Sequence, residues 1–486
     1  MRGGRIFGSL ILGLACGLCW TVANGRAEDA APDAGPKTVA FNVTPAKPSY
    51  QPLRNNLLPK KLDLQPGNAV PLYLKACLLA ADASREKESQ QLQEKIGKWL
   101  ETPPADLPRD EVRAVLQKYR AIMNLVRIAA RRERCEWDFP FREQPFYSIV
   151  LPELQWLRTL ARVVALDARL KIADGNPDEA IQDLQTGFAM ARHAADAPTL
   201  VNGLVGVAIA KLMFDQLCVL ITLPNSDNLY WSLSVLPDPL IDLRPALEFE
   251  GDAIYLLCPQ LRGADTADRS EIQWQADLNS LLKTVKTFTE ASGDPQEQPW
   301  VKLLELATQT TTMIPKAKAV LREDGWPDER IDGLLPAQLI VVGTAVGYAH
   351  FRDETFKWRS IPYGQGEAGG AHAEKLFHDA RDKEVIPLAG LLLPAIGSVR
   401  RNTVRLDRSI AALRIVEALR GYAATHDGKL PERLDEVVEL PIPLNPQTGK
   451  PFEYSLKDGR ATLAAPPQTG ATASQSALRF EISIAR

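Results

Sequence analysis

The sequence predicts a mainly α-helical protein: an irregular multi-helical array followed by a small C-terminal α+β module. That module is expected to combine one long helix with a two- to three-stranded antiparallel sheet. Three observations lead to this class. Apolar residues recur every three or four positions through most of residues 68–384. The 36 prolines suit many short helices with firm ends. Apolar and polar residues alternate over Leu478–Ile484, as in a half-buried strand.

The first 27 residues predict an export signal. Arg2 and Arg5 give a positive start, Ile6–Val22 is apolar, and Gly25-Arg26-Ala27 is a tolerable cleavage site. An uncleaved N-terminal membrane anchor is the alternative, because the apolar run is nearly long enough to span a bilayer. We therefore expect a protein of the periplasm or cell envelope.

Residues 28–67 follow as a predicted extended linker, rich in Ala, Pro, Asn and Lys and without apolar periodicity. The all-α domain is expected over residues 68–384. Its first helices are predicted at 72–81, 85–101 and 109–134.

An aromatic-rich segment over Cys135–Val150 breaks the helical pattern. It is either an aromatic binding surface or a loop folded onto the helical core, and we favour the folded loop. Its aromatic residues are Trp137, Phe139, Phe141, Phe146 and Tyr147.

Residues 153–223 predict a helical hairpin and a third helix. Asp174-Gly175 marks the stop of one helix, and Asn176-Pro177 followed by acids marks the start of the next. The same order of residues recurs over 324–331. Shared helix-stop and helix-start chemistry is the favoured explanation, and an old duplication is the alternative.

The helix expected over Leu200–Leu223 is apolar enough to raise the question of a membrane span. Lys211 and Asp215 lie in its middle, and each charge would cost a few kcal/mol at a bilayer centre. We interpret it as a core helix with a polar stripe. Further helices are predicted at 227–236, 244–257, 270–290, 299–322, 328–358 and 371–383.

The C-terminal module is expected over residues 385–486. Its long helix has one apolar side, and its charged residues are assigned to the remaining surface: Arg405, Arg408, Arg414, Glu417 and Arg420. Gly428 supplies the helix stop, and Pro431 predicts a short second helix. A β-hairpin is predicted around Lys457-Asp458-Gly459, with Leu478–Ile484 as the third strand.

This module resembles pilin and pseudopilin modules. Leu391–Arg401 (LLLPAIGSVRR) is similar to the stem helix of pilin-like proteins abundant in planctomycetes, and Leu413–Pro431 continues their pattern. Pro446–Tyr454 stands where type II secretion pseudopilins have a Trp-containing turn, although the Trp is absent. The prepilin peptidase site is also missing, so the resemblance implies shape rather than filament assembly. The whole layout is similar to uncharacterised exported helical proteins of planctomycetes.

Charge and cysteine content narrow the function classes. The net charge is −3, which disfavours nucleic-acid binding. The basic cluster Arg127, Arg131, Arg132 and Arg134 is interpreted as a solvated helix end. Outside the cytoplasm, two disulfides and four buried free thiols are equally open alternatives. The cysteines concerned are Cys77, Cys135, Cys218 and Cys258.

No motif in the sequence specifies a reaction. The Gly-rich run Tyr363–Gly370 lacks the strand and the Gly-Lys-Ser/Thr of a phosphate loop, and is expected to be a flexible loop. The closest approach to a metal cluster does not place two imidazoles on one helical face, so no metal and no cofactor are expected. Its residues are His372, Glu374, His378 and Asp379.

The expected function is that of an exported, non-catalytic scaffold that binds other envelope proteins. An envelope hydrolase with carboxylates from separate helices is the first alternative, because such acids leave no local signature. A minor pseudopilin-like secretion component is the second alternative. No catalytic residue is named from the sequence.

Overall fold

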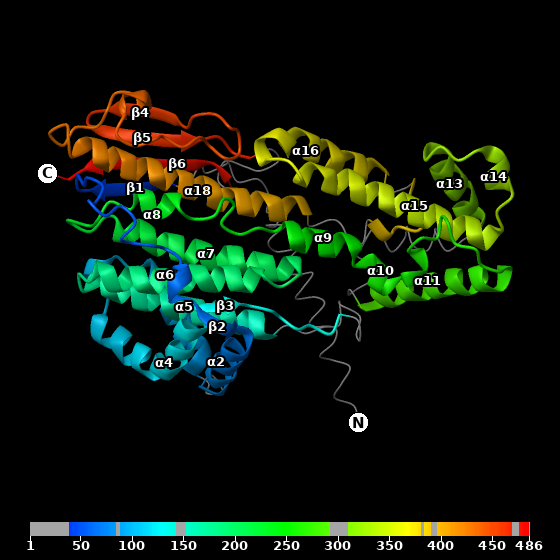
Figure 1. Cartoon of the computed structure of the whole chain (residues 1–486), viewed down its shortest axis with the longest axis horizontal. Coiled ribbons are helices and arrows are strands. Elements are labelled where there is room, and N and C mark those ends of the chain that lie inside the picture. Colours follow the sequence, from blue (N-terminus) through cyan, green and yellow to red (C-terminus); the bar gives the residue numbers. More distant parts are fainter. Residues whose placement is uncertain are drawn as a thin grey trace. The chain divides into compact units, whose positions relative to one another are not determined.

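A computed structural model describes residues 38–83, 88–141, 152–291, 310–380, 383–389, 396–468 and 476–485. It is mostly helical with a small C-terminal sheet, so the predicted fold class is confirmed (Figure 1). The chain forms two compact units. The sheet unit comprises the described residues within 29–138, 151–243 and 401–486, and the helical unit those within 139–150 and 244–400. The sequence instead groups residues 68–384 together and sets 385–486 apart.

Helices α5, α6 and α7 form the centre of the sheet unit. The apolar faces of consecutive helices meet in this layer, with Leu160, Leu184 and Leu217 fully buried. The helices of this unit are α2 (Val70–Ala83), α3 (Glu88–Glu101), α4 (Arg109–Ala129), α5 (Pro152–Ala173), α6 (Pro177–Ala195), α7 (Leu200–Leu220), α8 (Tyr230–Ser234) and α18 (Ile396–Ala423).

The turn between α5 and α6 has the predicted helix-stop geometry. Gly175 takes a φ of 76°, and the N–H of Asn176 donates to the carbonyl of Lys171 at 2.8 Å. The second copy of the pattern repeats it, with Gly325 at 90° and Trp326 donating to Leu321 at 2.9 Å. Both turns thus end a helix with the same geometry, which shared helix-stop chemistry and an old duplication both predict.

Helix α7 is long and apolar enough to cross a membrane by length and composition, the one such helix among the described residues. Within the sheet unit it packs against α5 and α6, and 61% of its most apolar 18-residue stretch is buried. Lys211 and Asp215 pair on its exposed side. This arrangement fits the interpretation as a core helix with a polar stripe.

The C-terminal sheet has four strands in the order β1-β6-β5-β4. β4 (Glu453–Lys457) and β5 (Arg460–Ala465) form the predicted hairpin, with Asp458 and Gly459 at positive φ. β6 (Leu478–Ile484) pairs antiparallel with β5, as predicted. β1 then adds a fourth strand in parallel, so the sheet is mixed rather than wholly antiparallel.

Strand β1 (Thr38–Val43) lies inside the segment predicted to be a linker, and that prediction was wrong here. Phe41 and Val43 point into the core, and the Phe41 ring meets that of Phe480 edge-on at 5.0 Å. The apolar alternation covers only a few residues, too few to stand out from the surrounding polar sequence.

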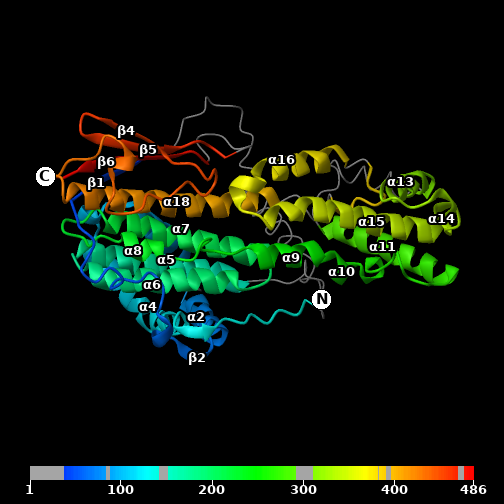
Figure 2. The same cartoon turned by 45° about the horizontal axis from the view of Figure 1, so that its top comes forward.

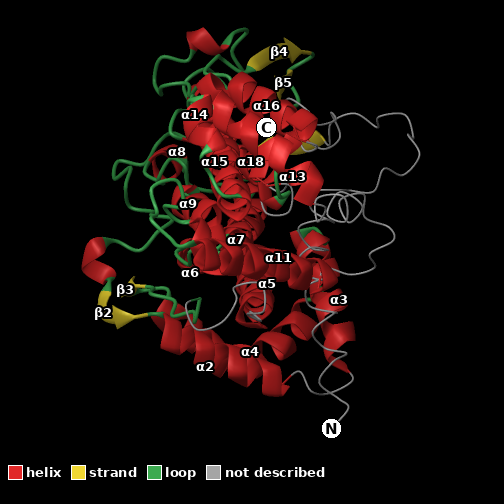
Figure 3. Ribbon diagram, turned by 90° about the vertical axis from the view of Figure 1, so that its right-hand side faces the viewer, coloured by secondary structure: helices red, strands yellow, loops and turns green. Residues whose placement is uncertain are grey.

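A second short ladder uses the end of the same segment. β2 (Gln65–Asn68) pairs in parallel with β3 (Arg132–Arg134), apart from the larger sheet (Figure 3). A short 3-10 turn, Lys61–Asp63, precedes β2. Where it is described, the expected linker is therefore tied to the rest of the sheet unit through β1 and β2.

Helix α18 is buried on nearly every side, which corrects the predicted exposed charged surface. It lies between the sheet and helices α7 and α8 (Figures 1 and 2). Leu406 and Leu413, on the predicted apolar face, are buried as expected. Arg405 is exposed, but three of its charged neighbours are buried: Arg408, Glu417 and Arg420.

The region after α18 also differs from prediction in one element. Gly428 stops the helix at a φ of 75°, and His426 stacks on Tyr422 with ring centres 3.7 Å apart. The expected second helix is only a 3-10 turn, Leu434–Glu436. The Tyr454 hydroxyl donates to the carbonyl of Pro431 at 2.7 Å, which holds the start of this segment against β4.

The helical unit contains more breaks than predicted. The expected helix 244–257 is interrupted at Ala253, and 328–358 is interrupted between Asp332 and Pro336. Its elements are α9 (Arg244–Asp252), α10 (Ile254–Leu257), a turn at Pro259–Leu261, α11 (Glu271–Ala291), α13 (Thr310–Glu323), α14 (Asp328–Asp332), α15 (Pro336–Phe356), a turn at Lys357–Arg359, and α16 (Tyr363–Ala380).

The Gly-rich run Tyr363–Gly370 is helical, so the predicted flexible loop was wrong. It forms the first half of α16. A Cβ at Gly369 would approach the Trp358 indole to 2.4 Å. The glycine therefore serves close packing of the helix against this ring.

Replacing Phe41 tests whether β1 is part of the fold. Because its side chain is 2% exposed, Phe41→Ala should lower the stability of the sheet unit by about 3–5 kcal/mol. Thermal unfolding and hydrogen exchange at β6 would measure the loss. Thr38→Ala, at an exposed position of the same strand, is the control. Equal behaviour of both variants would show that β1 contributes nothing to the unit.

Candidate functional site

The connection between α7 and α8 forms the candidate site. Residues 221–229 form a turn in which Asn225 takes a φ of 58°, an uncommon conformation for a residue other than glycine. The Ser226 hydroxyl donates to the carbonyl of Ile221 at 3.1 Å. The turn ends as Leu229 and Tyr230 enter the core.

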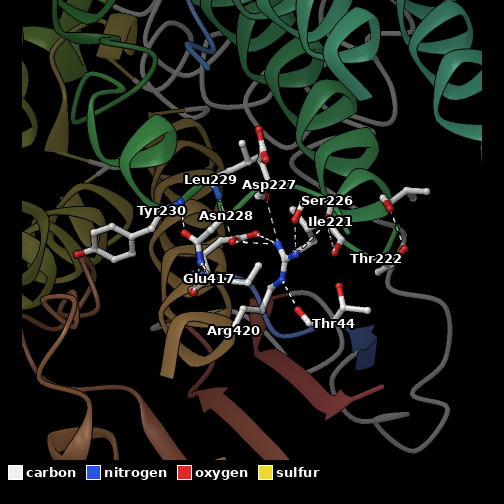
Figure 4. Close-up of polar contacts among 12 residues, drawn as sticks. Thr44, Ile221, Thr222, Ser226, Asp227, Asn228, Leu229, Tyr230, Glu417 and Arg420 are labelled. Carbon is white, nitrogen blue, oxygen red and sulfur yellow. Dashed lines mark hydrogen bonds and ion pairs between the residues drawn. The ribbon is translucent and has the colours of Figure 1, made fainter. Parts of the chain in front are cut away.

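A buried ion pair on α18 holds this turn. Glu417 and Arg420 are one helical turn apart, and both side chains are 0% exposed. Arg420 Nη1 lies 2.9 Å from Glu417 Oε1 and 3.0 Å from Oε2. The backbone N–H of Leu229 donates to Glu417 Oε2 at 3.1 Å (Figure 4).

The other N–H groups of Arg420 bind backbone carbonyls on two segments. Nη2 donates to the carbonyl and the hydroxyl of Ser226, at 2.8 and 2.9 Å, and Nη1 donates to the Asp227 carbonyl at 3.3 Å. Nε donates to the carbonyl of Thr44 at 3.0 Å. The guanidinium fork thus joins the turn to the segment that follows β1 (Figure 4).

Asn228 completes the connection. Its side-chain amide donates to the carbonyls of Ala46 and Glu417, at 2.9 and 2.8 Å. The Ala46 N–H donates to the Arg420 carbonyl at 3.1 Å. Burial raises the pKa of Glu417, and the charge and hydrogen bond of Arg420 oppose that shift. Because Ser226, Asn228, Leu229, Glu417 and Arg420 are all buried and bonded to one another, we interpret the network as a support for the turn.

A pocket of about 210 Å³ opens on the outer side of this turn. Ile181, Leu220 and Leu229 form its buried apolar floor. At the rim, Arg54 Nη2 lies 3.1 Å from Asp178 Oδ2, and both side chains are more than half exposed. The Asn55 amide donates to Asp227 Oδ2 at 2.9 Å. The wall that carries Ser226 and Asp227 is the one that Arg420 holds.

The sequence did not indicate this pocket, although it named the two residues behind it. Glu417 and Arg420 were expected on an exposed surface. The pocket residues come from three distant segments: 54, 177–181 and 220–229. Apolar residues lie on several faces of α18 around Glu417, among them Ile415 and Leu419, which are both fully buried. This pattern could have predicted from the sequence that the helix is buried on nearly every side.

A second charged cluster joins acids from separate helices, α5 and α6. Arg127 lies 2.6 Å from Asp167 and 3.2 Å from Asp183, and Lys171 lies 2.5 Å from Asp183. Burial raises the pKa of Asp183 to about 6, with Asp167 adding to the shift. Arg127 was predicted to be a solvated helix end, but it is partly buried in this cluster.

The described cysteines are free thiols rather than disulfides; Cys77, Cys135 and Cys258 are buried as that alternative expected, whereas Cys218 is only half-buried. Burial raises the pKa of Cys77 and Cys258 to about 12 and that of Cys135 and Cys218 as well. Such thiols carry little thiolate near neutral pH.

No histidine described in the structure is among the residues that line the pocket. His193 accepts or donates a hydrogen bond with the Tyr73 hydroxyl at 3.0 Å, and burial lowers the pKa of His193 to about 4. His372 is exposed on α16, and the side chains of Glu374, His378 and Asp379 lie outside the described set. Within the described residues, no group of three or more His, Cys, Asp or Glu side chains is placed to hold a metal.

The aromatic segment packs onto the core where it is described. The Trp137 indole donates to the carbonyl of His193 at 2.8 Å. In the helical unit, the Phe141 ring lies 4.9 Å from that of Phe249. Phe146 and Tyr147 lie outside the described residues. These contacts agree with the favoured interpretation of a folded loop.

Comparison with family models, with curated proteins and with solved structures finds no match to this chain.

Removing Arg420 should weaken the sheet unit and loosen the pocket wall. Arg420→Met leaves Glu417 buried without its partner, which typically costs about 3–5 kcal/mol. Unfolding curves and faster amide exchange over residues 226–229 would measure both effects. Arg405→Met, at an exposed position of the same helix, should change stability by less than about 0.5 kcal/mol. Similar losses in both variants would contradict the supporting role.

Another acid on α18, the half-buried Asp407, predicts a dependence of stability on pH. Burial raises the pKa of Asp407 to about 7, Asp238 nearby adds to the shift, and the N–H of Leu240 opposes it. The folded protein therefore keeps this proton while the unfolded chain releases it near pH 4. The stability that comes from this group is present below about pH 4 and is lost as pH rises through about 7.

Replacing Asp407 should remove that dependence. Asp407→Asn should raise the Tm at pH 8 by several degrees relative to the parent chain, with a smaller effect at pH 5. Thermal unfolding at both pH values measures the difference. Asp435→Asn, at an exposed position, is the control. A larger gain at pH 5 than at pH 8 would contradict the assignment.

Proposed function

We propose that this chain is a non-catalytic protein-binding protein of the cell envelope, and that the pocket beside the 221–229 turn is its docking point. The observation that carries the proposal is a small pocket with an apolar floor, a charged rim and a wall fixed from behind. This combination is the usual anatomy of an anchor pocket in a protein–protein interface.

The size of the pocket favours a side chain over a whole small molecule. Ligand and substrate pockets usually enclose about 300–1,000 Å³, and this one encloses about 210 Å³. A single anchoring side chain of a partner matches that space better. The partner's remaining contacts would spread over the surrounding surface.

The rigid wall supports recognition by lowering the cost of binding. Arg420 fixes the carbonyls of Ser226 and Asp227, and Glu417 fixes the N–H of Leu229. A wall already held in its bound form loses less conformational entropy when a partner arrives. The left-handed backbone of Asn225 is consistent with a turn kept for function.

An envelope hydrolase is the alternative, and the acid cluster of α5 and α6 is the observation that favours it. Asp167 and Asp183 come from separate helices, and the pKa of Asp183 is raised to about 6. However, the Asp183 side chain is 2% exposed and both acids pair with Arg127 and Lys171. This arrangement favours a structural ion cluster, because a substrate needs access to the acids.

Export and the pilin-like resemblance complete the proposal. The N-terminal signal predicted from the sequence supports a place in the periplasm or cell envelope, with an N-terminal anchor as the alternative. A long helix followed by an antiparallel hairpin has the shape of a pilin-like module. A minor pseudopilin-like role is the remaining alternative, and it is disfavoured by the missing prepilin site.

Site-specific photo-crosslinking in cells that produce the full-length chain tests the docking point. A photoreactive residue at Asn176, beside the pocket rim, should give a discrete adduct with another protein. The same residue at Lys118, exposed on α4, is the matched control and should give little. Equal adducts at both positions, or none at Asn176, would contradict the proposal.

A further inference from the structure

The pocket lining combines apolar and charged groups, and this combination restricts what fits. Its floor is apolar, while Arg54, Asp178 and Asp227 contribute charged groups. A wholly apolar side chain would displace water from the Asp227 carboxylate without replacing its hydrogen bonds, which costs roughly 1–3 kcal/mol for a group left unsatisfied. The best occupant therefore has an apolar stem and a polar or charged end.

The net charge of the pocket lining determines which charge the end of the bound side chain should carry. Among the described residues that line the pocket, Asp178 is paired with Arg54, whereas Asp227 accepts from the neutral amide of Asn55. Behind the wall, Glu417 and Arg420 balance each other. The lining is therefore negative by one charge, and the acid that carries it is Asp227, which is exposed.

We propose that the pocket takes a basic side chain, an arginine or a lysine, presented by a segment of a partner protein. The methylene stem would lie on Ile181 and Leu229, and the cation would meet Asp227. Long basic side chains bury their stems on apolar surface while the charge stays at the edge. An acidic side chain would be repelled by Asp227, the one lining charge that is not balanced by another lining residue. This inference rests on the proposed protein-binding function and names the chemistry of the partner.

Selection from a displayed library of random heptapeptides on the intact protein tests the preference. Peptides should be enriched in Arg or Lys at one position. Their affinity should fall with added NaCl, because the rim is exposed to solvent. Asp227→Asn, which keeps an acceptor oxygen for Asn55, should weaken these peptides by about tenfold, as expected for the loss of a hydrogen bond to a charged group.

Glu179→Gln is the matched control, because Glu179 is an exposed acid next to Asp178 that does not line the pocket. It should leave peptide affinity within about twofold of the parent chain. Enrichment of apolar or acidic anchors, equal effects of the two variants, or no enriched peptide would each overturn the basic-side-chain assignment. Photo-crosslinking at Asn176 decides the proposed function separately, because it does not depend on the nature of the anchor.

Discussion

The buried pair of Glu417 and Arg420 is the interaction on which the sheet unit depends. Two charges without solvent are expensive unless hydrogen bonds satisfy both. Here Arg420 binds Glu417 and three backbone carbonyls, and Glu417 also accepts from Leu229. One guanidinium thus joins α18, the turn before α8 and the segment after β1. The same turn forms one wall of the pocket.

The same use of arginine recurs elsewhere in the sheet unit. Arg408 donates to the carbonyls of Ser476 and Pro466, at 3.0 and 2.8 Å. Arg169 donates to those of Leu100 and Thr102, at 2.6 and 2.8 Å, where α3 ends. Chain ends and turns leave carbonyls without helix or sheet partners. Buried guanidinium groups satisfy them, which lets irregular connections lie inside the core.

Sequence patterns predicted the elements whose signal is local. The stop at Gly175, the hairpin at Asp458-Gly459 and the strand Leu478–Ile484 each follow from a few adjacent residues. The predictions that failed concern elements whose structure depends on residues far away in the sequence. Strand β1 forms by pairing with β6, which lies far from it in the sequence. Arg420 of α18 is buried and binds the carbonyls of Thr44 and Ser226, which are also distant in the sequence. The pocket joins three such segments, so periodicity carried no information about it.

The pairing of β1 with β6 limits when the sheet unit can fold during synthesis. Phe41 and Ser483 are joined by a hydrogen bond across 442 positions of sequence. During translation, β1 leaves the ribosome long before β6 has been synthesised. Domains otherwise tend to fold in the order of their synthesis. The edge of β1 that pairs with β6 therefore stays without its partner until residues 478–484 have emerged from the ribosome. The sheet unit can therefore close only after β6 has been synthesised, however early β1 leaves the ribosome.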